Sequence, residues 1–235
     1  MTLDQVMIEL AAKGSEATKK LLVKHGAKEP FFGVKIADLK PLHKKLKGEQ
    51  ALALKLYATG NGDAQYLAGM IADGAKMTPA QLDIWAKSAG WCMISGTIVP
   101  WVASEHPAGF ALALKWVDSP VEGVAIAGWK TLGALAATVP DDQLPVKPWS
   151  ALLDRVAKTL PAAPNDVRSA MNGFLIACGT YIAPLGDKAI ATARKLGKVE
   201  IDMGDTACKV PDAEVYIMKY RRGAPVAPKR KTVRC

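Results

Sequence analysis

Apolar residues recur at intervals of three and four along almost the whole chain, which predicts amphipathic α-helices rather than strands. The period is interrupted at 29–33, at a GNG turn (60–62) and at a proline-rich link (140–148). The only alternating stretch, 199–202, is too short for more than a stray extended segment. Helices are therefore expected over 3–12, 16–25, 34–46, 50–58, 64–75, 91–102, 107–117, 121–139, 149–160, 166–183, 187–196 and 211–220, with one more starting at Thr78.

Two of these helices carry start signals. The motif TPAQ at 78–81 has a capping Thr, Pro at the first helical position and Gln three residues after the cap. The motif SPVE at 119–122 follows the same logic, so Ser119 and Glu122 are expected to form a capping box. Pro41, inside 34–46, should kink its helix or mark the first turn.

Consecutive helix pairs recur every ~35–45 residues, the range of HEAT-like repeats. Stacked pairs would form an all-α superhelix, a curved α-solenoid with a concave surface. A compact, irregular helical bundle is the alternative. We expect one HEAT-like repeat domain at 1–220, followed by a basic tail at 221–235.

Composition excludes several classes of protein. No run approaches the ~20 apolar residues of a membrane span, and Asp4 and Glu9 interrupt the N-terminal apolar stretch, unlike a secretory signal peptide. A cytoplasmic location without membrane contact is therefore expected. The four cysteines and three histidines show no metal or disulfide spacing, so no metal and no cofactor are predicted.

Positive charge is concentrated at the two ends of the chain. The last seventeen residues hold seven Lys and Arg and no acid, out of a net charge of +9. The first 48 residues hold ten Lys and five acids, whereas 49–214 has a small acidic excess. Clustered cations suit a polyanion such as DNA, although a solubilising tail and solvated lysine faces are the common alternatives. The cations expected to bind DNA are Lys19, Lys20, Lys44, Lys45, Lys229, Arg230, Lys231 and Arg234.

The C-terminal third carries a resemblance to a known family. The motif KVEIDMGDTACKVPDA at 198–213, the pair Tyr216-Ile217 and the ending KRKTVRC at 229–235 resemble a bacterial branch of the AlkD-like DNA alkylation repair family. The GVK motif at 33–35 and the segment 85–101 are similar to that family's early and central helices. The resemblance implies a HEAT-like superhelix that holds duplex DNA. It also implies the family's activity, which is the excision of N3- or N7-alkylated purines by DNA glycosylases.

The site motif departs from the family pattern. The glycosylases carry Trp-Asp-x-x-Asp, whereas this chain reads WCMIS at 91–95, with Trp91 kept and Cys92 and Ser95 in place of the acids. A fixed carboxylate stabilises the positive charge that develops on the sugar, and losing such a group costs on the order of 10²–10³ in rate. The next groove helix has no Arg over 121–130. Phe174 and Ala177 stand where the family presents Trp and Arg.

Three functions stay open at this point. The first is a DNA-binding HEAT-like repeat protein that contacts the phosphates of duplex DNA, alkylated or damaged DNA included, without base excision. The second is an active alkylpurine glycosylase with a non-standard site, and the third is a protein-interaction scaffold. Trp91 would either stack on DNA or belong to the core with the other tryptophans. Asp118 and Glu122 resemble a catalytic carboxylate pair. A turn explains Asp118 better, and the capping box explains Glu122 better.

Overall fold

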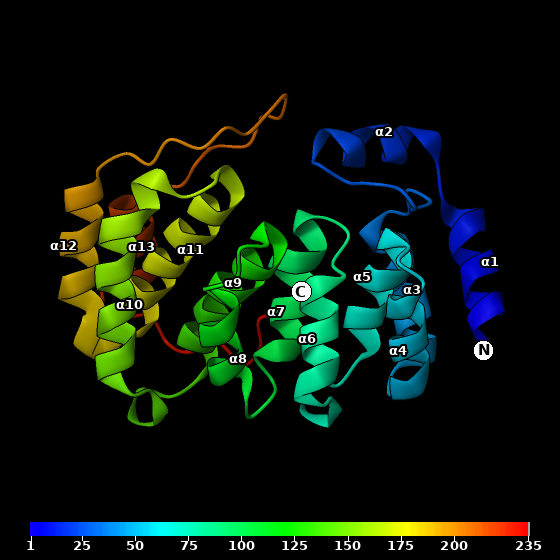
Figure 1. Cartoon of the computed structure of the whole chain (residues 1–235), viewed down its shortest axis with the longest axis horizontal. Coiled ribbons are helices and arrows are strands. Elements are labelled where there is room, and N and C mark those ends of the chain that lie inside the picture. The colour runs from blue at the N-terminus through cyan, green and yellow to red at the C-terminus, as the bar shows by residue number, and fades with distance from the viewer. Residues whose placement is uncertain (235) are drawn as a thin grey trace. The chain divides into compact units, whose positions relative to one another are not determined.

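The computed structural model describes residues 1–234, which are helical and contain no β-strand (Figure 1). The predicted all-α class is therefore confirmed for this part of the chain. The chain divides into two compact units: residues 1–112 with 204–206, and residues 113–203 with 207–234. The helix α8 (Gly109–Trp116) crosses the boundary.

Unit 1 is built from seven helices and one π-helical turn. The π turn is Ile94–Ile98, and it runs directly into α7. The helices are α1 (Leu3–Lys13), α2 (Glu16–Lys24), α3 (Ile36–Leu46), α4 (Gln50–Ala58), α5 (Gly62–Ile71), α6 (Pro79–Lys87) and α7 (Val99–Ala103).

The core of unit 1 lies around α4, α5, α6 and α7. The rings of Tyr57 and Trp85 stack at 3.9 Å, and the Tyr57 hydroxyl donates to the Trp85 carbonyl at 2.7 Å. Tyr66 meets Trp101 edge to face. These aromatic pairs join α4 to α6 and α5 to α7, so the tryptophans fix how neighbouring helix pairs stack.

Unit 2 is centred on one long helix, α11 (Asn165–Tyr181), which contacts the four other helices of the unit (Figure 1). These helices are α9 (Glu122–Thr138), α10 (Val146–Thr159), α12 (Gly186–Leu196) and α13 (Ala213–Arg221). Phe174 lies between Trp129 and Trp149, with ring centroids 5.2 and 5.8 Å apart. The core interpretation of Trp85, Trp101, Trp116 and Trp129 is thus correct, since each is buried.

The start signals meet different outcomes. Thr78 and Gln81 form the predicted capping box before α6. The box predicted at Ser119 and Glu122 is wrong, because α9 begins at Glu122 itself and has no side-chain cap. The Ser119 hydroxyl accepts from the Val121 N–H instead, which closes a local turn before the helix starts.

Pro41 is the sixth residue of α3 and lies in its interior rather than in the first turn. Its ring is exposed, while Leu39, Leu42 and Leu46 form the buried stripe of the helix.

No single helix within residues 1–234 is long and apolar enough to cross a membrane. The helix α11 and the segment Ala183–Leu196, bent by 118° at the break between them, would be long and apolar enough only as a pair.

Candidate nucleic-acid interface

The segment that follows α6 carries the residues on which the expected chemistry depends. Its helix contains a π turn at Ile94–Ile98, in which the Val99 N–H donates to the Ile94 carbonyl. Pro100 has no N–H to give to the carbonyl four residues earlier, so a break in the regular ladder is expected here. The π turn changes which way the side chains of this segment face.

Ser95 is buried within this π turn, with 1% of its surface exposed. Its hydroxyl lies 3.4 Å from the carbonyl oxygens of both Trp91 and Cys92 and donates within its own helix. A neutral hydroxyl occupied by backbone carbonyls has neither the charge nor the freedom of a carboxylate that faces a substrate. The described geometry therefore gives Ser95 no nucleophile or base role.

Trp91 differs from the five buried tryptophans because it is half-buried at the start of the segment. It lines a small, mostly apolar cavity with residues of α2, α3, α5 and the loop before α3, among them Leu22, Tyr66 and the loop residue Phe31. The cavity measures about 40 Å³, which is room for a few water molecules and not for a nucleobase. Trp91 thus contributes the edge of a surface recess rather than the wall of a base-sized pocket.

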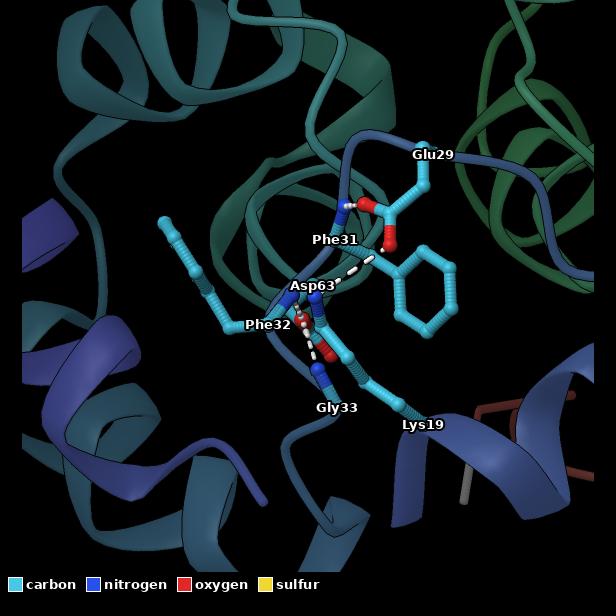
Figure 2. A network of polar contacts seen from close by, with 6 residues as sticks. All are labelled: Lys19, Glu29, Phe31, Phe32, Gly33 and Asp63. Atoms are coloured by element: carbon cyan, nitrogen blue, oxygen red, sulfur yellow. Dashed lines mark hydrogen bonds and ion pairs between the residues drawn. The ribbon is translucent and has the colours of Figure 1, made fainter. Parts of the chain in front are cut away.

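Asp63 lines the same recess and has a structural role that the sequence did not reveal. Its carboxylate accepts the N–H groups of Phe32 and Gly33, at 2.6 and 3.0 Å (Figure 2). It also accepts the Val34 N–H, at 3.1 Å. Burial raises the pKa of the Asp63 carboxyl, and the three backbone donors and Lys19 act against that shift. With all three donors in place, Asp63 holds the loop 30–35 against the start of α5.

A second carboxylate ties α2 to the same loop. Glu29 accepts from the Phe31 N–H at 3.0 Å and from Lys19 Nζ at 3.2 Å (Figure 2). These two donors, the Phe31 N–H first, lower the pKa of the Glu29 carboxyl. Lys19 also lies 5.5 Å from the centre of the Phe31 ring. Of the lysines expected to bind DNA, Lys19 is therefore committed to an internal clamp, whereas Lys20 is exposed.

Lys44 and Lys45 lie in the last turn of α3 and are exposed. Their charges also suit the negative end of the helix dipole. Unit 1 also contains Trp91, Lys19 and Lys20. Trp91 contacts the loop 30–35 through the shared recess, and Lys19 is tied to the residue before this loop through its pair with Glu29.

In unit 2 the last part of the basic tail folds back onto the helices of that unit. Lys229 Nζ lies 2.7 Å from the Asp141 carboxylate and donates to the Ala136 carbonyl at 2.9 Å. The Arg230 N–H donates to the Ala137 carbonyl, and the Ala227 N–H to the Thr180 carbonyl. The tail thus caps the C-terminal ends of α9 and α11. Lys229 is half-buried in these contacts, while Arg230 and Lys231 stay exposed.

The first cation of the predicted tail belongs to the last helix of unit 2. Arg221 is the last residue of α13, is buried, and donates to the Gly179 carbonyl from Nε at 2.8 Å. A side chain on Gly186 would collide with this guanidinium. One of the seven terminal cations is therefore a core residue. Arg234 is half-buried, and Cys235 lies outside the described residues.

The remaining candidates in unit 2 belong to packing. Asp118 pairs with Arg155 at 2.5 Å, which leaves it unsuited to act as one of two catalytic carboxylates. Glu122 is exposed at the rim of a cavity of about 250 Å³ that Arg155 and Trp129 also line. Phe174 is buried in the aromatic core and Ala177 is half-buried. No group of three or more metal-ligating side chains occurs within residues 1–234.

Comparisons with known proteins agree with this architecture. The model of the family described as DNA alkylation repair enzyme matches residues 6–202. Uncharacterized proteins of Listeria innocua and Listeria monocytogenes are each 33% identical over 227 residues, which covers 94% of this chain and 98% of theirs.

A solved structure is also similar over the full length of both chains, with 37% identity and a TM-score of 0.89. That protein is described as one of a new family related to the HEAT-like repeat DNA glycosylases, with affinity for branched DNA structures. The likeness confirms the predicted HEAT-like repeat architecture.

Proposed function

The chain belongs to the DNA alkylation repair enzyme family, and from that premise we propose that it binds branched DNA through backbone phosphates without excising bases. The observation that carries this proposal is the full-length likeness to a protein with affinity for branched DNA, at 37% identity and a TM-score of 0.89. Conservation of fold at that level makes the same class of ligand the first to test.

The charge distribution supports phosphate contact. Lys20, Lys44 and Lys45 in unit 1 and Arg230 and Lys231 in unit 2 are exposed, and no ion pair within residues 1–234 neutralises them. Exposed Lys and Arg release the counterions condensed on DNA when they bind it, so affinity for any DNA should fall as salt rises. Phosphate contacts position a protein on DNA without reading its sequence.

The site residues support a loss of excision. Ser95 stands where the family motif has its second carboxylate, and its buried hydroxyl donates to Trp91 and Cys92 of its own helix. Asp63, the carboxylate of the recess beside Trp91, is held by three backbone donors. Neither residue supplies a free negative charge to a developing oxocarbenium ion.

Binding is tested by fluorescence anisotropy with a four-way junction, a linear duplex of the same length and a single strand, each at two salt concentrations. We expect the tightest binding to the junction and a negative slope of log affinity against log salt for all three. Equal affinity for the junction and the duplex would contradict the branched-DNA part. If none of the three DNAs binds in a salt-dependent way, the result would favour the protein-interaction scaffold over a DNA-binding function.

Excision is tested on duplex DNA that contains 7-methylguanine or 3-methyladenine, with the protein in excess over DNA in single turnovers. We expect no release of free base above the rate of the DNA alone. Release at a rate that follows protein concentration would overturn this part and favour the alkylpurine glycosylase.

A further inference from the structure

The helix α2 (Glu16–Lys24) stands out because it buries almost nothing. Thr18 is its only buried residue, and Leu22 and Lys19 are half-buried. Leu21 and Val23 keep 55% and 57% of their surface exposed. A helix of nine residues is not stable by itself in water, so other contacts must hold α2 in place.

The polar contacts lie at the start of α2 and near the middle of the helix. The Ser15 N–H donates to the Gly33 carbonyl at 3.2 Å, and the Ser15 hydroxyl caps the helix at Thr18. Gly33 has a φ of +78°, and a side chain there would come within 2.8 Å of the Ser15 carbonyl and the Lys19 nitrogen. The Lys19–Glu29 pair closes the other side (Figure 2). Asp63 in turn anchors the loop, so α2 is a fixed arm and not a loose one.

Each flank of this arm carries one exposed apolar side chain, and lysines follow toward its C-terminal end, whereas Glu16 lies in its first turn. Leu21 and Val23 are two positions apart, and at 100° per residue they face nearly opposite directions. Lys20, Lys24 and Lys28 are exposed around them and pair with no acid within residues 1–234. Single exposed apolar side chains are common on protein surfaces, and what distinguishes Leu21 and Val23 is the group of unpaired lysines beside them.

We infer that α2 is a wedge for the branch point of DNA, with Leu21 and Val23 against unstacked base-pair faces and Lys20, Lys24 and Lys28 on the phosphates beside them. This inference rests on the proposed function. A branch point is where two neighbouring arms end their stacking, so it offers two apolar base faces framed by phosphates. Charge favours this occupant over a basic peptide, and two opposed apolar flanks match two base faces.

The contact is an external one. Proteins that unstack base steps do so with Leu, Ile, Met or Phe side chains pressed against the base faces. The recess between α2 and Trp91 holds only about 40 Å³, so a base does not enter the protein behind the wedge. A linear duplex has continuous stacking and gives the two apolar side chains nothing to cover, whereas the lysines serve both forms of DNA.

The test uses the full-length protein with the double substitution Leu21→Ser and Val23→Ser. Binding is measured on a four-way junction and a matched linear duplex, each carrying 2-aminopurine next to the centre, whose fluorescence rises when the base loses its stacking. For the parent we expect a fluorescence rise on the junction only. For the double variant we expect that rise to disappear and junction affinity to fall roughly tenfold, with duplex affinity unchanged within about twofold.

Two control variants separate the parts of the proposal. Ile8→Ser with Ile84→Ser removes two apolar side chains of α1 and α6 that are more exposed than Leu21 and Val23, and this variant should bind both DNAs as the parent does. Lys20, Lys24 and Lys28→Gln should weaken both DNAs and reduce the salt slope by roughly 2–3.

A double variant that keeps junction affinity and the fluorescence rise would overturn the wedge. A parent that does not prefer the junction would overturn the proposed function itself, and the two failures are therefore distinguishable. Helical circular dichroism and thermal unfolding check that each variant is folded, which the exposure of Leu21 and Val23 leads us to expect.

Discussion

At the scale of single residues, the side chains that matter most in unit 1 are carboxylates with backbone partners. Asp63 and Glu29 together accept four backbone N–H groups from a loop of irregular structure. Such a loop cannot satisfy its own amides through a helix, so each donor needs an acceptor elsewhere. These residues carry no catalytic role, yet they place α2 and the Trp91 recess.

Asp63→Asn should lower the free energy of unfolding by about 2–3 kcal/mol. An amide keeps one acceptor oxygen but presents an NH₂ group to at least one of the three loop N–H groups, which leaves a buried donor unsatisfied. Urea unfolding measures the change. As a control, Asp4→Asn alters an exposed acid in the first turn of α1 and should cost less than about 1 kcal/mol. Equal effects would show that the three hydrogen bonds do not stabilise the loop.

The clamp that Glu29 forms with Lys19 and the Phe31 N–H depends on pH. Its pKa is lowered from 4.5 in the folded state, so the ionised clamp is intact at neutral pH. The contribution of the ionised Glu29 to stability is present above the ordinary pKa of a glutamate, and it is lost as the pH falls through the lowered pKa. The Phe31 amide shift, followed by NMR, should titrate with a midpoint below 4.5. A midpoint at or above that value, or no titration of this amide, would contradict the clamp.

At the scale of elements, the tail and the ends of α9 and α11 depend on one another. The final turn of a helix leaves carbonyls without intrahelical partners, and here Lys229 and two tail N–H groups supply donors. Asp141 links the two helices further, since it pairs with Lys229 and accepts the Ala183 N–H at 2.9 Å. The segment 227–230 is therefore partly a structural strap.

Two substitutions in the tail should separate its structural and binding parts. Lys229→Gln removes a half-buried charge with two partners and should lower the melting temperature, at a cost of about 1 kcal/mol. Lys231→Gln removes an exposed charge and should change stability by less than about 0.5 kcal/mol. Thermal unfolding of both variants measures this. If Lys231→Gln destabilises the protein as much as Lys229→Gln does, the strap is not held by Lys229.

At the scale of the whole molecule, the excess positive charge lies in the sequence-terminal parts and not in the middle. Unit 1 contains the lysine-rich first 48 residues, and the tail belongs to unit 2. Two of the terminal cations, Arg221 and Lys229, are bound inside unit 2. The charge available to a polyanion is consequently smaller than the net charge of +9 suggests.

Lys44→Gln with Lys45→Gln should reduce the slope of log affinity against log salt by roughly 2, because each lost phosphate contact removes about 0.9 from the slope. The comparison variant is Lys147→Gln with Lys158→Gln, which removes two exposed charges from α10 in the acidic middle region. That variant should keep the parent slope. Salt titrations with linear duplex DNA measure both, and equal slopes for the two variants would remove α3 from the interface.

The sequence by itself determined the helices, most of their ends, the aromatic core and the absence of acids from the WCMIS segment. These features are local, since apolar period and capping chemistry act within one or two turns. The sequence did not predict the uncapped start of α9 beside Ser119, nor the structural roles of Asp63, Lys19, Arg221 and Lys229. Each of the last four has a partner at least ten residues away, up to 93 for Lys229 and Ala136. Only the tertiary structure decides such partners, because the packing of helices, and not the chain order, brings a charge to its acceptor.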